Sequence, residues 1–275
     1  MTIATTSSRS DFAQLQNGHE ALRIYFTDSD PANEAAPIVA TLHGSGPGSS
    51  GVSSFLSNRQ SLLEQGFRVI TLDLPGWGRS DPVLCKQDRS ALNAAALNVV
   101  LDAAGISKPV HVLGASMGAH SAIAFALERP GRVEKLVLVA GGTGGRSSFQ
   151  PNLPDGVLSM LDFYADPNIA KLRHFLTTVF ASSSLVTEEL VQAMYQAALA
   201  RPDHLNHFSS SIQLYPQQFS DVSSRLYEIK QPALVVWGTE DRFVPLDIGL
   251  QIATRMARAN FHVYGQTGHA PHVER

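Results

Sequence analysis

Residues 110–128 constrain the fold of this chain more than any other segment. A run of β-branched and apolar residues (110–113) leads directly into the pattern Gly-x-Ser-x-Gly at 114–118, and a helix-forming stretch follows at 121–128. This order predicts a strand, a tight turn and a helix, the context of a nucleophile elbow. Such a turn lifts the hydroxyl of Ser116 above a sheet, at a helix N-terminus whose dipole favours developing negative charge. The alternative is a Gly-Ser turn that only links two elements. It is disfavoured because the sequence predicts the required strand before the turn and the required helix after it.

The composition narrows the class of protein. A chain of 275 residues with 44% hydrophobic and 16% charged residues is typical of a globular domain, or of a core domain with an insertion. The net charge is -3 and basic residues are scattered, so we expect no nucleic-acid partner. The single Cys85 excludes an internal disulfide and fits a reducing compartment. We find no secretory signal and no apolar run long enough for a membrane helix, and therefore expect a cytoplasmic protein without membrane contact.

Short β-branched runs alternate with helical patterns, which predicts an α/β fold with a mostly parallel central sheet and helices on both faces. Residues 141–224 interrupt this alternation, because they carry no strong strand pattern but several amphipathic helices, including 168–180 and 187–200. We expect residues 1–140 and 225–275 to form the core, with 141–224 inserted as a helical lid over the C-terminal ends of the strands. The expected strands are 37–43, 67–73, 110–114, 133–140, 233–238 and 260–264, and a further helix is expected at 90–103.

A serine hydroxyl is a weak nucleophile near neutral pH, so Ser116 requires a histidine base and an acid that orients it. After a nucleophile elbow the chain order is serine, acid, histidine. Asp241 follows the strand at 233–238, at the same sheet edge as the elbow, with Glu240 as the alternative acid. His269 follows the last strand on a glycine-containing loop, and His272 is its competitor.

A developing oxyanion would need two backbone donors. One is the N–H of Met117, the residue after the nucleophile, and the other is expected from the small-residue loop at 43–48, with Ser45 as the donor. The alternative for this loop is a flexible glycine turn. We interpret Asp73 as part of a structural turn near the site. Since no residues have metal-ligand spacing and no dinucleotide-binding glycine pattern opens the first helix, we expect neither a metal nor a cofactor.

Together these motifs resemble the α/β-hydrolase fold and, within it, the meta-cleavage product hydrolases, which cleave a carbon–carbon bond in the ring-fission products of bacterial aromatic degradation. The resemblance implies that Ser116, Asp241 and His269 are nucleophile, acid and base, that Ser45 and Met117 hold the oxyanion, and that the chain forms a homo-oligomer. It covers residues 42–269 and is carried by HGSGPG (43–48), LDLPGWGRSD (72–81), GASMGAHSAIAFALERPGRVEKLVLVAGGTGG (114–145), SLVTEELVQ (184–192), RPDHLNHF (201–208) and WGTEDRFVPLDIGL (237–250).

Four positions depart from the family pattern. Where family members have Asn, Arg, Trp and Asn to hold the carboxylate and enol oxygen of a 2-hydroxy-6-oxodienoate, this chain has Ala115, Met194, Ala270 and Ser54. Replacing Arg by Met removes a bidentate carboxylate partner and leaves an apolar, adaptable side chain. We therefore expect a rather apolar substrate pocket. Its expected lining is Gly44, Ser54, Ala115, Met117, Phe149, Leu153, Met194, Phe243, Val244 and Ala270.

These observations lead to one main functional hypothesis and two alternatives. The first is hydrolysis of a carbon–carbon bond in a small vinylogous 1,5-diketone-like substrate, with an altered carboxylate-binding pocket. A carboxylesterase or lactonase acting on a less anionic acyl compound is the alternative within enzymes. A ligand-binding receptor that retains the fold is the third hypothesis, although a receptor has no need of Ser116, Asp241 and His269 together.

Overall fold

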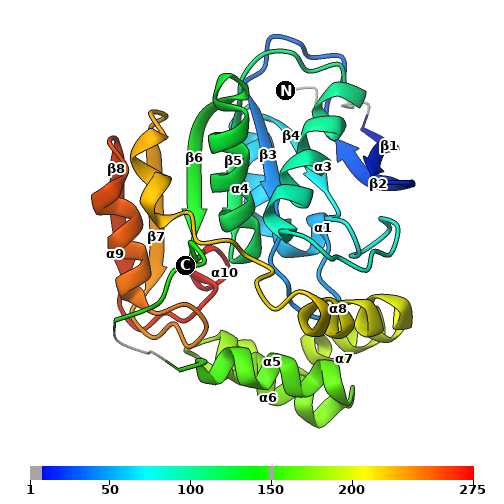
Figure 1. Ribbon diagram of the computed structural model, residues 1–275, viewed down its shortest axis with the longest axis vertical. Helices are drawn as coiled ribbons and strands as arrows, with labels where there is room; N and C mark the ends of the chain where they lie inside the picture. Colours follow the sequence, from blue (N-terminus) through cyan, green and yellow to red (C-terminus); the bar gives the residue numbers. More distant parts are fainter. Residues whose placement is uncertain (1–7, 149–151) are drawn as a thin grey trace.

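A sheet of eight strands in the order β1-β2-β4-β3-β5-β6-β7-β8 forms the centre of the protein (Figure 1). The computed structural model describes residues 8–148 and 152–275. β2 pairs antiparallel with β1 and with β4, and the other neighbouring strands are parallel. The expected mostly parallel α/β sheet is thereby confirmed. The strands are β1 (Arg9–Asn17), β2 (Glu20–Asp28), β3 (Ile38–Leu42), β4 (Arg68–Leu72), β5 (Val110–Ala115), β6 (Val133–Val139), β7 (Ala233–Gly238) and β8 (Ala259–Tyr264).

None of the expected strands corresponds to β1 or β2. The signal of the hairpin that they form is nevertheless present, because Gly18 and His19 separate two segments in which buried and exposed residues alternate. Gly18 has φ +63°, a conformation that favours glycine in a two-residue turn. The register places Leu15 opposite Leu22, both buried. Polar residues between the inward positions leave these strands without the continuous apolar run of the fully buried β3 and β4.

Helices flank the sheet. On the face turned to the viewer in Figure 1 lie α3 (Arg89–Ala103), α4 (Met117–Glu128) and α9 (Leu246–Arg255). On the opposite face, α2 (Leu56–Glu64) borders the side chains of His111 and Leu113. Shorter elements complete the core, namely α1 (Gly51–Ser54), α10 (Pro271–Glu274) and the 3-10 helices η1 (Pro130–Arg132) and η3 (Ser223–Glu228).

Between β6 and β7 the chain forms four helices that lie together beyond the ends of the central strands (Figure 1). Two of them begin with side-chain caps, because Asn168 accepts a hydrogen bond from the N–H of Lys171 and Thr187 accepts one from that of Leu190. No strand occurs in the described part of residues 141–224. The helices are α5 (Asp155–Ala165), α6 (Ile169–Val179), α7 (Glu188–Leu199) and α8 (Pro202–Leu214), with the 3-10 helix η2 (Ser183–Leu185) between α6 and α7.

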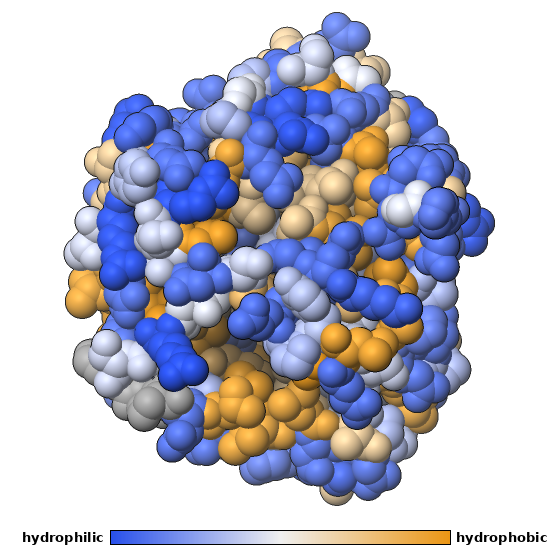
Figure 2. Space-filling view, in the orientation of Figure 1, coloured by the Kyte–Doolittle hydropathy of each residue, from blue (hydrophilic) through white to orange (hydrophobic). Residues whose placement is uncertain are grey.

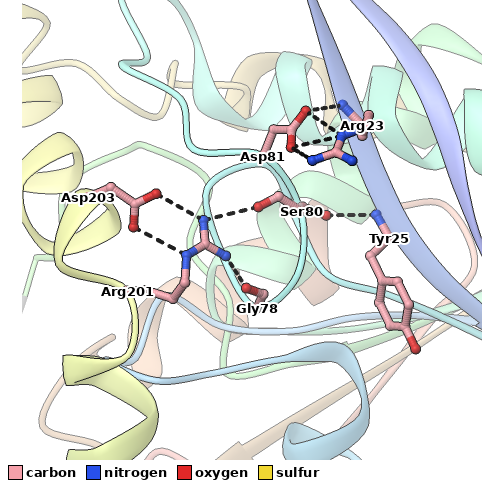
Figure 3. A network of polar contacts seen from close by, with 7 residues as sticks. All are labelled: Arg23, Tyr25, Gly78, Ser80, Asp81, Arg201 and Asp203. Carbon is pink, nitrogen blue, oxygen red and sulfur yellow. Dashed lines mark hydrogen bonds and ion pairs between the residues drawn. The ribbon is translucent and has the colours of Figure 1, made fainter.

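Arg201, immediately before α8, fastens this helical block to the core (Figure 3). Its guanidinium donates to the carbonyl oxygens of Gly78 and Ser80 and forms an ion pair with Asp203 at 3.2 Å. The hydroxyl of Ser80 in turn accepts a hydrogen bond from the backbone N–H of Tyr25 in β2, at 2.9 Å. The loop that follows β4 is therefore held between the core hairpin and α8.

Polar side chains cover much of the face shown in Figure 2, while apolar side chains gather at its lower edge, where α5 lies in Figure 1. Leu153 and Leu158 are among the exposed apolar residues of this segment. Within residues 8–148 and 152–275, no helix combines the length and apolar character that crossing a bilayer requires.

Candidate active site

Ser116 occupies the turn between β5 and α4, with φ 54° and ψ -120°. This conformation is costly for a residue with a side chain, and close packing of the neighbouring backbone enforces it. A Cβ atom on Gly114 would lie 2.3 Å from the carbonyl oxygen of Gly118, and one on Gly118 would lie 1.9 Å from that of Leu42. The two glycines of the motif are therefore required by steric fit, and the turn they allow exposes the serine hydroxyl above the strand ends.

Three loops bring a serine, a histidine and an aspartate into one hydrogen-bonded row. His269 Nε2 lies 2.9 Å from Ser116 Oγ, and His269 Nδ1 lies 2.9 Å and 3.0 Å from the two carboxylate oxygens of Asp241. The Asp241 side chain is 1% exposed. With Nδ1–H donating to the carboxylate, Nε2 is left to accept the proton of the serine hydroxyl. This arrangement can activate Ser116 as a nucleophile.

The Asp241 carboxylate is itself held in place. Its Oδ1 accepts hydrogen bonds from the backbone N–H groups of Phe243 at 2.7 Å and Val244 at 2.9 Å. The ring of Phe243 stacks on the imidazole of His269, with centroids 4.6 Å apart and planes inclined by 27°. Glu240, the alternative acid, is exposed and its backbone N–H bonds to Thr267, so it takes no part in this row.

The loop carrying His269 is tied to the helical block. The backbone N–H of His269 donates to the carbonyl oxygen of Val179 at 2.8 Å. Glu274 of α10 accepts hydrogen bonds from the N–H of Gly268 at 2.8 Å and from that of Ala181 at 3.1 Å. His272, the competing base, packs against Phe55 outside the row, and burial lowers its pKa to about 4.

The loop after β3 places a backbone donor next to Ser116. A Cβ atom on Gly44 would lie 3.2 Å from Ser116 Cβ, so this backbone approaches the nucleophile closely. His43 Nε2 accepts a hydrogen bond from the N–H of Leu74, so its Nδ1–H donates to the carbonyl oxygen of Gly44 at 2.7 Å. Because the C=O and N–H of one peptide point in opposite directions, this bond turns the N–H of Ser45 away from His43. Burial lowers the pKa of His43, which keeps the imidazole in this neutral form.

Two further groups complete this part of the site. Met117 is the first residue of α4, where a backbone N–H has no acceptor within the helix. The hydroxyl of Tyr164, from α5, lies 3.0 Å from the carbonyl oxygen of Ser45 and 3.0 Å from Nε2 of His204, from α8. Tyr164 and His204 are not among the predicted site residues, because only the packing of α5 and α8 brings them to the loop.

The cleft at Ser116 has two arms that meet at this residue. One is lined by residues of α7 and is called the α7 arm, and the other is lined by residues of α8 and is called the α8 arm. The α7 arm has a volume of about 350 Å³ and the α8 arm one of about 450 Å³, and both include Ser45, Ser116, Met160 and Phe243. Met160 and Phe175 are lining residues that the sequence analysis does not name. The remaining lining of the α7 arm includes Gly44, Gly46, Ser49, Ser53, Ser54, Ala115, Phe175, Leu190, Ala193, Met194, Ala197, His269, Ala270 and His272, and that of the α8 arm includes Met117, His120, Leu153, Val157, Leu161, Phe208, Ile212, Gln218, Phe219 and Val244.

The other predicted positions divide between these arms. Gly44, Ser54, Ala115, Met194 and Ala270 line the α7 arm, whereas Met117, Leu153 and Val244 line the α8 arm. Phe149 lies outside the described residues.

Asp73 lies outside both arms. Its carboxylate accepts hydrogen bonds from the N–H groups of Gly51 at 2.7 Å and Arg79 at 2.8 Å, in agreement with a structural turn. Among the residues that the structure describes, no three His, Cys, Asp or Glu side chains group as metal ligands would.

Comparison with known proteins places these features in context. A sequence model described as alpha/beta hydrolase fold matches residues 39–275. A 2-hydroxy-6-oxononadienedioate/2-hydroxy-6-oxononatrienedioate hydrolase of Paraburkholderia phymatum is 45% identical over 265 residues, 96% of this chain and 91% of that protein. The structure of a meta-cleavage product hydrolase from Pseudomonas fluorescens superimposes with a TM-score of 0.78 at 27% identity, covering 92% and 89% of the two chains. An esterase from Exiguobacterium antarcticum shares the fold, with a TM-score of 0.79 at 23% identity over 97% and 94%.

Proposed function

This chain belongs to the α/β hydrolase fold family and to the group of hydrolases that includes the Paraburkholderia relative, and on that premise we propose which reaction it catalyses. The reaction is hydrolysis of a carbon–carbon bond next to a ketone carbon. The substrate is a small vinylogous 1,5-diketone, so its second carbonyl group can accept the electron pair of the broken bond through a carbon–carbon double bond. The observation that carries the proposal is the continuous row Ser116–His269–Asp241, with hydrogen bonds of 2.9 Å at both imidazole nitrogens. The family and the names of the relatives support the choice of bond.

In the proposed mechanism, His269 Nε2 accepts the proton of Ser116 while the serine oxygen attacks the ketone carbon. The ketone oxygen becomes an oxyanion, which the N–H groups of Ser45 and Met117 stabilise. The carbon–carbon bond then breaks, its electron pair passes into the conjugated chain, and His269 returns the proton to that leaving group. Water, deprotonated by His269, releases the acyl group from Ser116 as a carboxylic acid. If His269 instead deprotonates a water that attacks the ketone directly, the same groups act without an acyl-enzyme.

Ester or lactone hydrolysis is the second candidate, because the same tetrahedral oxyanion forms when an ester carbonyl is attacked. The specific observation that favours it is the side chain of Met194 in the α7 arm, which offers no charge to the carboxylate of a dienoate.

One assay distinguishes the two candidates. The methyl ester of a 2-hydroxy-6-oxo-dienoate ring-fission product, which carries no carboxylate, and an uncharged aryl ester are supplied side by side, and loss of the dienoate absorbance is compared with release of the phenol. We expect loss of the dienoate absorbance with wild-type enzyme and none with Ser116→Ala. Fast ester turnover without any loss of dienoate absorbance would contradict the proposal of carbon–carbon bond hydrolysis and favour ester or lactone hydrolysis.

Two further properties belong to the proposal. A cytoplasmic location is supported by the lone Cys85, which is buried and unpaired. Self-association as a homo-oligomer is supported by the resemblance to related enzymes, and light scattering of the purified protein tests it.

A further inference from the structure

We infer that the cleft selects a substrate that is uncharged at both ends, with a neutral hydrogen-bonding group in the α7 arm and an apolar group in the α8 arm. This inference rests on the proposed function, which places the reacting carbonyl at Ser116 where the arms meet. It goes beyond that function because it fixes the charge of the substrate, a property on which the reaction at Ser116 does not depend.

The α7 arm has one apolar wall and one neutral polar wall. Leu190, Ala193, Met194 and Ala197 of α7 form the apolar wall. No lysine or arginine is among the described residues that line this arm. The polar wall consists of Ser49, Ser53, Ser54 and His272.

His272 contributes a polar but neutral group to this wall. Its Nδ1 is buried and has no hydrogen-bond partner among the described residues. Burial, together with the nearby His269, lowers the pKa of His272 to about 4, so the ring carries no charge at neutral pH. Hydroxyl groups and a neutral imidazole can pair with a hydroxyl, ketone or ester oxygen, but they do not neutralise a carboxylate.

The α8 arm is more apolar still. Its lining includes Val157, Leu161, Phe208 and Ile212. Besides Ser45 and Ser116, the polar side chains of His120 and Gln218 reach this arm, and the core already uses their hydrogen-bonding groups.

His120 lies 2.6 Å from the hydroxyl of Ser90 and 3.2 Å from the carbonyl oxygen of Ser220. Gln218 donates to the carbonyl oxygens of Ser211 at 3.0 Å and Tyr215 at 2.8 Å, and its own carbonyl accepts from Arg89. Neither side chain is free to receive a charged group of the substrate.

Arg89 packs against Phe208, one of the lining residues of this arm, and against Trp77. Its guanidinium lies 5.5 Å from the ring centre of Phe208 and 5.2 Å from that of Trp77, and the residue is 1% exposed. Arg89 lines neither arm. A carboxylate in the α8 arm would therefore lose its hydration without gaining an ion pair.

The relatives provide the contrast. The Paraburkholderia enzyme is named for dienedioate and trienedioate substrates, which carry a carboxylate at each end. Burying an ionised carboxylate without a partner is strongly unfavourable, whereas a ketone of the same size transfers at much lower cost. We therefore expect this chain to discriminate at least about 100-fold against a carboxylate in either arm.

Two esters of matched length test this expectation. Mono(4-nitrophenyl) adipate and 4-nitrophenyl 6-oxoheptanoate differ only in that a methyl ketone replaces the terminal carboxylate. Activated esters report on Ser116 whichever bond is the natural one. We expect kcat/KM for the ketone ester to exceed that for the adipate ester by about 100-fold or more, with neither ester turned over by Ser116→Ala.

Arginine variants provide the second measurement. Met194→Arg adds a cation to the α7 arm and Ile212→Arg adds one to the α8 arm, so one of them should raise kcat/KM for the adipate ester about 10-fold, whichever arm holds the acyl chain. Gln196→Arg is the matched control, because it adds the same charge to an exposed position of α7. The melting temperature of each variant and its turnover of the ketone ester verify that it is folded.

The outcomes separate the two claims. If the wild type hydrolyses both esters within threefold of each other, or if Gln196→Arg raises adipate turnover as much as the two cleft variants do, the charge inference is wrong while the proposed function stands. If the wild type hydrolyses neither ester faster than Ser116→Ala does, the proposed function itself fails.

Discussion

At the scale of single residues, neighbouring backbone atoms position the nucleophile and leave it little freedom. Ser116 keeps its positive φ of 54° because Gly114 and Gly118 pack against backbone carbonyls at distances that no side chain would tolerate. Such strain costs about 1–3 kcal/mol and persists where the surrounding structure over-determines the conformation. The hydroxyl is therefore preorganised toward His269, at 2.9 Å, before any substrate binds.

Substitutions of Asp241 and Glu240, which are adjacent in the loop after β7, test which carboxylate orients His269. Asp241→Asn keeps the size of the side chain but loses the carboxylate that accepts the Nδ1–H of His269, so it favours the wrong imidazole tautomer. We expect kcat to fall about 10⁴-fold with little change in the melting temperature. Steady-state kinetics on the substrate that the wild type turns over measures the effect.

Glu240→Gln is the control for this substitution. Glu240 is exposed and precedes Asp241 directly in the chain. We expect its kcat to stay within twofold of the wild type. If the two variants lost activity to the same extent, Asp241 would not be the acid of the row.

At the scale of elements, the helical block takes part in building the site as well as covering it. The hydroxyl of Tyr164, from α5, donates to the carbonyl oxygen of Ser45 at 3.0 Å and accepts from Nε2–H of His204, from α8, at 3.0 Å. Trp77 packs on His204 with ring centroids 4.5 Å apart. Burial lowers the pKa of His204 to about 3 and raises that of Tyr164, so both side chains are neutral. The chain His204–Tyr164–Ser45 therefore links two helices to the loop whose Ser45 N–H we propose as an oxyanion donor.

Tyr164→Phe tests this link. Without the hydroxyl, the carbonyl of Ser45 loses its partner and the peptide that presents the Ser45 N–H becomes less well oriented. We expect kcat to fall about 10-fold while KM changes less than twofold, because the oxyanion forms only in the transition state.

Tyr195→Phe on α7 is the matched control. It removes the same hydroxyl from a half-buried tyrosine of the helical block, and we expect no effect on kcat. A Tyr164→Phe variant with a lower melting temperature but wild-type kcat would show that Tyr164 stabilises the fold and does not position the loop.

At the scale of the whole molecule, histidine burial links stability to pH. Burial is the first cause that lowers the pKa of His43, His111, His120, His204 and His272, with values of about 3 for His204 and about 4 for His272. In the unfolded chain these rings take up protons as the pH falls below about 6.5. The folded protein binds fewer protons, so the free energy of unfolding decreases as the pH falls through this window.

Urea denaturation between pH 7 and pH 4 measures this decrease. We expect the free energy of unfolding to fall by up to roughly 1.4 kcal/mol per pH unit for each of His43, His120, His204 and His272, and His204→Asn to reduce the slope. His174, an exposed residue of α6, is the control position, and His174→Asn should leave the slope unchanged. A free energy of unfolding that stayed constant down to pH 4 would contradict the prediction.

Much of the fold could be predicted from the chain because the relevant signals are local. The apolar runs of β3 and β4 are continuous since both of their faces are buried, and Asn168 and Thr187 mark helix starts with their own hydrogen bonds. The hairpin of β1 and β2 is absent from the prediction although its alternation and its two-residue turn at Gly18 and His19 are present. Because the hairpin lies at the edge of the sheet, every second residue is polar. The composition of these strands therefore differs less from that of a loop than the composition of β3 and β4 does.

The sequence by itself determined the order of the elements and the Gly-x-Ser-x-Gly turn, because strand, turn and helix preferences act over a few residues. Only the tertiary structure decided that Asp241 rather than Glu240, and His269 rather than His272, meets Ser116, since a shift of one or three residues along a loop reverses the direction of a side chain. It also decided the shape and charge of the two arms. Their walls come from segments more than a hundred residues apart, and the absence of a lysine or arginine among their described lining residues depends on which side of each helix faces the cleft.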